Sequence, residues 1–145
     1  RDAAWLTAHG YPAIGFDAAP ALLAEARRRH PGLRFETATL PALDEIAGTF
    51  DNVICETVIM HLPVARIAAA VDSLERILKP GGTLYLSWRV TEGADRRDAA
   101  GRLYSAFPAD HVVGRLRGCA ILHLEDTISA SSGKRICRIV ARMPA

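Results

Sequence analysis

Three polar residues of a chemically useful kind follow short apolar runs in this chain of 145 residues. Asp17 comes directly after the run 12–16, Glu56 follows the run 53–55, and His61 lies shortly beyond it. A carboxylate at such a position can accept hydrogen bonds from the hydroxyls of a ribose. A histidine can take up a proton near neutral pH, and so can act as a general base. The sequence therefore predicts a binding or catalytic site built at strand ends.

The elements that must position these residues alternate along the chain. Short apolar runs predict strands, and apolar side chains at helical spacing predict helices that begin or end at proline and glycine. We expect residues 91–102 to form a loop or a mobile surface helix, and the last two strands to be an antiparallel pair because no helix separates them. The predicted helices cover 1–10, 20–30, 43–47, 63–78 and 108–117, and the predicted strands cover 12–16, 33–37, 53–55, 83–88, 119–127 and 134–143.

This order predicts an α/β fold of the Rossmann-like type. Its sheet is doubly wound and mostly parallel, and it closes with a C-terminal antiparallel hairpin. In such a sheet the ligand lies at the carboxyl ends of the strands. Those ends supply a short set of candidates: Asp17 and Ala18, Thr39 and Leu40, Glu56 to His61, and Trp88 with Arg89.

The composition narrows the function classes further. A net charge of +2, from 18 basic and 16 acidic residues, gives no reason to expect a nucleic-acid partner. Cys55, Cys119 and Cys137 lack the spacing of a metal site or a disulfide framework, so we expect no metal and a reducing, cytoplasmic location. No apolar stretch approaches the roughly 18 residues of a membrane span. The length favours one domain over residues 1–145.

Four segments together carry a family resemblance. In order and spacing, "GFDAAPALLAEARRRHPGLRF", "FDNVICETVIMHLP", "LERILKPGGTLYLSW" and the final hairpin resemble the class I S-adenosylmethionine-dependent methyltransferases. The resemblance implies a methyltransferase enzyme that uses S-adenosyl-L-methionine and a small-molecule methyl acceptor. It implies that Asp17 holds the ribose hydroxyls of this cofactor. The further cofactor contacts that it implies are Ala18, Thr39, Leu40 and Glu56.

The sequence departs from the family in two places. Thr39 stands where many members have an acid beside the adenine amino group, and a hydroxyl is the weaker acceptor there. The chain also starts with a segment that resembles the helix after the family's first strand and glycine-rich loop. We therefore expect the domain to be N-terminally incomplete. The resemblance places the absent strand between the strands that end at Phe16 and Cys55.

The roles of the remaining candidates stay open at this point. Asp17 can also act only as a turn residue, and His61 is either a base in the acceptor pocket or a half-buried histidine bonded to backbone. Glu56 can steer a cationic or amino acceptor, or bind a loop. Trp88 fits a core or pocket wall better than a ligand contact. An NAD-type oxidoreductase domain is a second possible function, because it also has an acid at the position of Asp17, but the final hairpin argues against it. A non-catalytic cofactor-binding or interaction module is a third.

Overall fold

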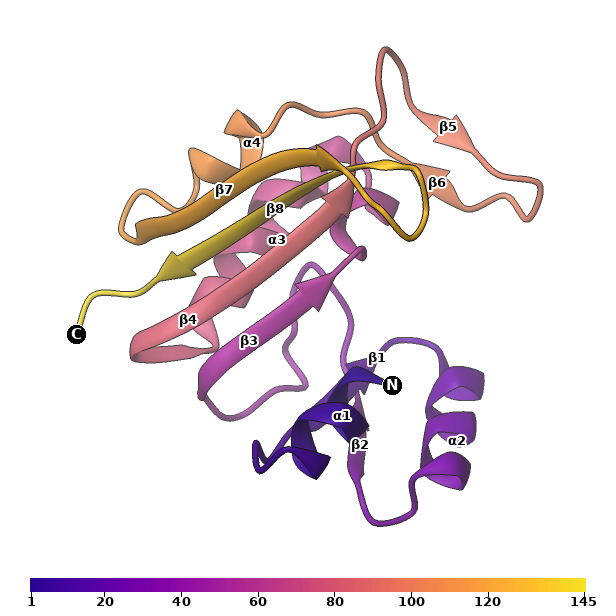
Figure 1. Cartoon of the computed structure of the whole chain (residues 1–145), viewed down its shortest axis with the longest axis vertical. Helices are drawn as coiled ribbons and strands as arrows, with labels where there is room; N and C mark the ends of the chain where they lie inside the picture. Colours follow the sequence, from indigo (N-terminus) through magenta and orange to yellow (C-terminus); the bar gives the residue numbers. More distant parts are fainter. The chain divides into compact units, whose positions relative to one another are not determined.

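The computed structural model describes residues 1–145, which form two compact units, Arg1–Ala47 and Gly48–Ala145. Their helices and strands are labelled in Figure 1. All predicted strands are present, and the α/β order of the elements follows the prediction except for one short helix that is absent and three short elements that were not predicted.

The first unit contains helix α1 (Asp2–Ala8), strand β1 (Ile14–Asp17), helix α2 (Pro20–Arg29) and strand β2 (Arg34–Thr37). Pro20 is the first residue of α2, where its missing N–H costs nothing because that group would have no helical partner. The two strands are parallel, and Asp17 pairs with Thr37 at their carboxyl ends. Both predicted strand ends of this unit therefore lie at one edge of one small sheet.

A glycine allows β1 and β2 to pack tightly. A Cβ atom on Gly15 would lie 2.6 Å from Cδ1 of Phe35, which is far inside normal contact distance. The backbone of β2 is also tied to α2, because the guanidinium of Arg27 donates to the carbonyl oxygen of Phe35 at 2.7 Å. Arg28 and Arg29 instead pair with Glu25, as expected for the solvated end of a helix.

The short helix predicted over 43–47 is absent. Leu43 adopts a φ of 54°, in the left-handed region that a right-handed helix cannot contain. Leu43 and Ile46 are nevertheless buried, and their amides donate to the carbonyls of Thr39 and Leu43. The apolar spacing thus reflects burial within consecutive turns and not a helix.

The second unit is built on a four-stranded sheet. Its strands are β3 (Phe50–Glu56), β4 (Leu78–Arg89), β7 (Ala120–Ile128) and β8 (Arg135–Arg142), arranged in the order β3-β4-β8-β7. Strands β3 and β4 are parallel, whereas β8 is antiparallel to both of its neighbours. The antiparallel C-terminal pair was predicted, and β8 lies between β4 and β7.

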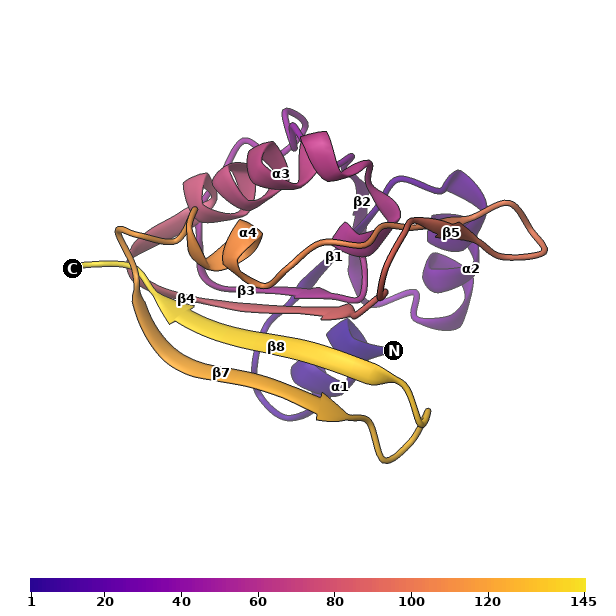
Figure 2. The same cartoon turned by 90° about the horizontal axis from the view of Figure 1, so that it is seen from above.

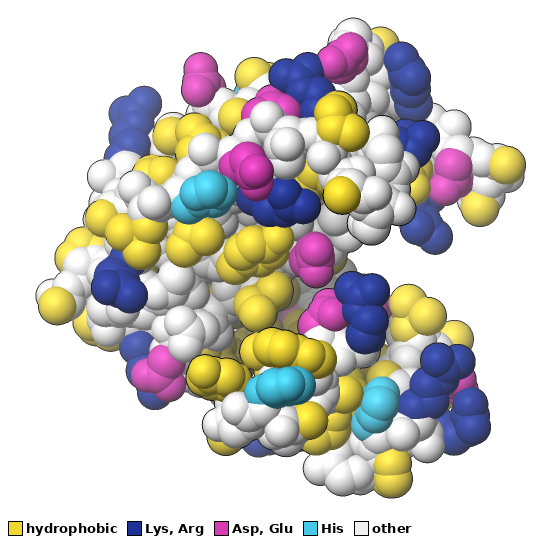
Figure 3. Space-filling view, viewed as in Figure 1, with side chains coloured by type: hydrophobic (Ala, Val, Ile, Leu, Met, Phe, Trp, Pro, Cys, Tyr) yellow, Lys and Arg dark blue, Asp and Glu magenta, His cyan; other side chains and the backbone are white.

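Helices α3 (Val64–Arg76) and α4 (Asp110–Val113) cover the same face of this sheet, as Figure 2 shows. The core lies between these helices and the sheet. Its fully buried side chains include Ile67 and Val71 of α3, Leu84 and Leu86 of β4, and Ile139 of β8. On the surface seen in Figure 3, hydrophobic side chains also gather over the face of the sheet that points away from α3.

Several boundaries in the second unit differ from the sequence-based prediction. Helix α3 ends at Arg76, and Leu78, expected in the helix, pairs with Phe50 as the first residue of β4. The predicted loop over 91–102 contains strand β5 (Arg96–Arg97), which pairs with β6 (Leu103–Tyr104). A short 3-10 helix, η1 (Ile59–His61), is also present, and α4 is shorter than its predicted segment. Backbone pairing that spans few residues leaves no periodic signal in the sequence.

Each unit has an edge strand, which is hydrogen-bonded to a neighbouring strand on one side only. Strand β1 pairs with β2 alone, and β3 pairs with β4 alone. The strand that the family resemblance places between them stays a prediction. The longest helix has 13 residues, and no helix of the chain combines the length and apolar character needed to cross a bilayer.

Candidate functional site

Asp17 is positioned by the turn from β1 into α2. Its Oδ1 accepts a hydrogen bond from the amide of Ala19 at 2.8 Å, and its backbone oxygen accepts from the amide of Ala38 at 3.2 Å. The carboxylate is half-buried, and its second oxygen, Oδ2, is left without a partner. Asp17 therefore stabilises the turn with one oxygen, and its role as a ligand-binding residue stays a prediction. Ala18 beside it is exposed and small, so it leaves room for a ligand.

Thr39 and Leu40 follow β2 at the same edge of this small sheet. The amide of Thr39 donates to the carboxylate of Glu45 at 3.3 Å. The pKa of Glu45 is lowered by a hydrogen bond from its own amide and, to a smaller degree, by bonds from Thr39. Thr39 is exposed and Leu40 is half-buried. Glu45 thus supplies a carboxylate at this edge, which sequence reasoning missed because the residue lies in a segment predicted to be helical.

Glu56 ends β3 and is exposed to solvent. It pairs in the parallel ladder with Ser87, and the next amide, that of Thr57, donates to the carbonyl of Ser87 at 2.9 Å. Thr57 has a φ of 55°, which is an outlier for a β-branched residue. The chain is therefore turned sharply away from the sheet directly after Glu56. Ser87 is buried, and its hydroxyl has no hydrogen-bond partner.

His61 is held by the backbone of β6. Its Nδ1 lies 2.6 Å from the carbonyl oxygen of Leu103. Because a carbonyl oxygen only accepts, Nδ1 carries the hydrogen, and Nε2 of the neutral ring is then the atom with a free lone pair. The ring is half-buried and meets the ring of Tyr104 edge-on, with centroids 4.8 Å apart. Both interpretations of His61 thus have a basis, since one nitrogen anchors the ring and the other can accept a proton.

Tyr104 and Arg89 are further residues of this end of the sheet. The guanidinium carbon of Arg89, at the end of β4, lies 5.3 Å from the centroid of the Tyr104 ring. The amide of Arg89 is directed at the sulfur of Met60, and the amide of Ser105 donates to the carbonyl of Met60. Strand β6 is therefore fastened to η1 and β4. No periodicity marked Tyr104, whereas Arg89 was recognisable as a strand-end residue.

Trp88 belongs to the core. Its side chain is 1% exposed and stacks on Phe107, with ring centroids 5.5 Å apart. Of its two possible roles, as a core or pocket wall or as a ligand contact, the structure supports the first.

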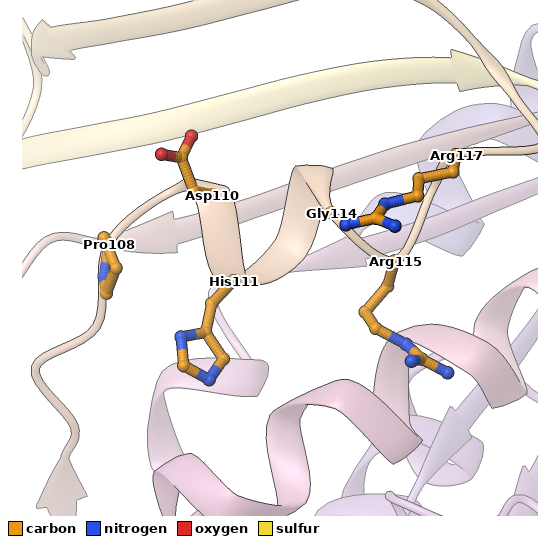
Figure 4. Close-up of a pocket in the computed structure, with 6 residues that line it drawn as sticks. All are labelled: Pro108, Asp110, His111, Gly114, Arg115 and Arg117. Atoms are coloured by element: carbon orange, nitrogen blue, oxygen red, sulfur yellow. The ribbon is translucent and has the colours of Figure 1, made fainter.

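A cavity of about 600 Å³ lies around α4, and none of the predicted site residues lines it. Figure 4 shows Asp110 and His111 pointing to opposite sides of α4. Arg115 on its border is bound to Asp72 of α3 through Nε at 2.8 Å. The residues that line this cavity around α4 thus include no pair of catalytic side chains that point toward each other.

The predicted residues form two groups, each at the carboxyl ends of parallel strands. Asp17, Ala18, Thr39 and Leu40 lie together in the first unit, whereas Glu56 and His61 lie in the second. Nowhere in the chain do three or more His, Cys, Asp or Glu side chains gather as a metal site would require. The first group offers a carboxylate and small or apolar neighbours, and the second offers a carboxylate and an imidazole.

Comparison with known families identifies the class of protein. The family model described as "Methyltransferase domain" matches residues 1–82, more than half of the chain, and the chain belongs to this family. A curated relative is the trans-aconitate 2-methyltransferase of Methylobacterium nodulans, which is 39% identical over 71 residues. That match covers 49% of this chain and 26% of the relative, so the chain spans about a quarter of the relative's length.

Solved structures confirm the Rossmann-like methyltransferase fold. An S-adenosylmethionine-dependent methyltransferase from Mesorhizobium loti matches with a TM-score of 0.78 and 17% identity, over 97% of this chain and 85% of that one. The 1,6-didemethyltoxoflavin-N1-methyltransferase of Burkholderia thailandensis, solved with 1,6-didemethyltoxoflavin and S-adenosylhomocysteine, matches with a TM-score of 0.74 and 21% identity. That match covers 100% of this chain and 67% of the other.

Proposed function

We propose that this protein is an enzyme that transfers the methyl group of S-adenosylmethionine to a small-molecule acceptor. Membership in the methyltransferase-domain family and the fold support the reaction class. The observation that carries the proposal is the half-buried carboxylate of Asp17, which keeps Oδ2 free at the carboxyl end of β1. Relatives that act on trans-aconitate and on 1,6-didemethyltoxoflavin support a small molecule as the acceptor.

The residues of the first unit fit the nucleoside part of this cofactor. Oδ2 of Asp17 is an acceptor for ribose hydroxyls, and a charged acceptor makes the stronger hydrogen bond. Exposed Ala18 permits close approach, Leu40 offers an apolar surface for the adenine ring, and Thr39 lies at the adenine edge. The bound cofactor supplies an electrophilic methyl group on a sulfonium.

In the second unit, His61 is the candidate base and Glu56 the candidate group for orienting the acceptor. Nε2 of His61 takes the proton that an OH or NH acceptor loses as the methyl group arrives. The bond from Nδ1 to Leu103 holds the ring in the tautomer that this step requires. Glu56 is exposed at the end of β3, where it can orient an amino acceptor, and its contact with the cofactor stays a prediction. We further propose a cytoplasmic location, which the three free cysteines support.

The test is calorimetric titration of S-adenosylhomocysteine into the intact protein and its Asp17→Asn variant. Asparagine keeps an oxygen for the amide of Ala19 and loses the charge, so the turn is preserved while ribose binding weakens. We expect the dissociation constant to rise about 30- to 150-fold, which corresponds to about 2–3 kcal/mol.

Asp44→Asn is the matched control, because Asp44 is an exposed acid of the same unit. It removes the same charge, and we expect it to leave the affinity unchanged. Unchanged affinity in Asp17→Asn would refute the ribose role. Binding of NADH in place of S-adenosylhomocysteine would favour the oxidoreductase alternative.

A further inference from the structure

A second cavity lies within the Gly48–Ala145 unit, at the carboxyl end of β4. Figure 1 shows the hairpin of β5 and β6 projecting from this end of the sheet. The volume is about 440 Å³, within the range of pockets that hold small molecules. Its ionisable lining is mostly basic, with four arginines and two carboxylates: Arg89, Arg96, Arg97, Arg135, Glu92 and Asp98.

Part of this charge is already used within the protein. Arg135 pairs with Asp126 at 2.7 Å and with Glu92 at 2.5 Å, so the carboxylate of Glu92 is engaged. Oδ1 of Asp98 accepts from the amides of Ala100 and Arg102, at 3.0 and 2.8 Å. Of the two acids of the cavity, Glu92 therefore neutralises Arg135, and Asp98 stabilises the turn of the β5–β6 hairpin.

Three of the four guanidinium groups, those of Arg89, Arg96 and Arg97, have no carboxylate partner. Arg97 donates to the carbonyl of Gly101 at 2.7 Å, which leaves Arg89 and Arg96 as the two arginines without an ion pair or a bond to a carbonyl. Arg89 lies over the ring of Tyr104, and Arg96 pairs with Tyr104 in the β5–β6 ladder. Arg89, Arg96 and Tyr104 thus line the same cavity. A guanidinium matches a carboxylate in shape and can bind both of its oxygens at once.

The cavity adjoins the candidate base. Tyr104 is shared by both, because its ring contacts the ring of His61 on one side and the guanidinium of Arg89 on another. We propose that this arginine cavity binds a carboxylate group of the methyl acceptor, through Arg89 and Arg96. The assignment of the ligand as the acceptor rests on the proposed function. The acceptor is then a small carboxylic acid whose reacting atom faces His61.

The experiment measures the binding of tricarballylate, a flexible tricarboxylate, to the intact protein by calorimetry. We expect saturable binding that weakens with added salt, and none of its neutral trimethyl ester. Arg96→Gln and Arg89→Gln are each expected to raise the dissociation constant about 10- to 100-fold, because each removes a charged donor. Arg117→Gln removes an equal charge from an exposed position outside the cavity, and is expected to leave the affinity unchanged.

Three results would overturn the proposal: no saturable binding of tricarballylate, equal binding of the ester, or equal losses in Arg96→Gln and Arg117→Gln. Tighter, arginine-dependent binding of inorganic phosphate would overturn the choice of a carboxylate. S-adenosylhomocysteine is titrated into the same samples, and its affinity should not depend on Arg96. If tricarballylate binds in an arginine-dependent way and S-adenosylhomocysteine does not bind, the anion site is supported and the proposed methyl transfer is refuted. If S-adenosylhomocysteine binds and tricarballylate does not, only the anion site is refuted.

Discussion

At the residue scale, His61 shows how one side chain can be structural and chemical at once. Its Nδ1 is committed to the carbonyl of Leu103, and its ring packs against Tyr104. Anchoring of this kind restricts the ring to one tautomer and one orientation, which a general base needs. The same contacts also fasten η1 to β6, so loss of the whole side chain would disturb both functions.

Substitution of His61 by asparagine separates the two roles. The Asn amide nitrogen can replace Nδ1 as donor to Leu103, but no atom replaces Nε2. We expect His61→Asn to keep the fold and to lower kcat about 10²- to 10⁴-fold, with loss of the pH dependence that the imidazole imposes. The measurement is the pH profile of kcat with an accepted substrate. If His61→Asn keeps full activity while His61→Ala loses it, the histidine only anchors η1.

At the element scale, the pairing of β1 with β2 depends on a glycine. Gly15 lies against the ring of Phe35, and this close contact brings the two strands into the register that aligns Asp17 with Thr37. Strand β1 carries the candidate ribose ligand. It is therefore positioned by the contact between Gly15 and Phe35 in its middle and by the turn at Asp17 at its end.

A methyl group at Gly15 is expected to destabilise this pair. Gly15→Ala should lower the free energy of unfolding by about 1–3 kcal/mol, because the new Cβ would lie 2.6 Å from the ring of Phe35. Gly32→Ala is the control, since a Cβ there meets nothing within 4 Å. Urea denaturation of the intact protein measures both. Adding Phe35→Leu should restore part of the loss, and equal stability of the two alanine variants would contradict the steric argument.

At the scale of the whole molecule, burial in the core changes the acidity of the cysteine thiols. Cys55 and Cys137 are buried, and all three thiols are free. Burial raises the pKa of Cys55 to about 12 and that of Cys137 to about 11. The native protein therefore keeps these thiols protonated at a pH where the unfolded chain ionises them.

This difference predicts a loss of stability in alkali. The thiol of Cys55 ionises near pH 9 in the unfolded chain and near pH 12 in the native protein, so its contribution is complete below pH 9 and is lost as the pH rises toward 12. We expect the advantage of wild type over Cys55→Ala to shrink by about 1–2 kcal/mol between pH 8.5 and 10.5. Urea unfolding across this range measures it. A constant difference would mean that the native thiol ionises normally.

The sequence by itself determined the order of the elements, the class of fold and the position of Asp17. Strand β1 and helix α2 are local features, because an apolar run, a carboxylate and Pro20 occur within a few residues. The antiparallel pair β7–β8 followed from the absence of a helix between them. Signals of this kind depend on neighbours in the chain, so they can be read without a structure.

The tertiary structure alone decided which distant groups meet. Leu103 holds the ring of His61 from 42 residues away, and Arg89 reaches Tyr104 across a loop whose two short strands have no periodicity. The turn conformation of Leu43 also overrode a helical pattern, because burial of its side chain is satisfied by turns as well as by a helix. Contacts between segments far apart depend on how the chain packs, and packing is a property of the whole fold and not of any local stretch.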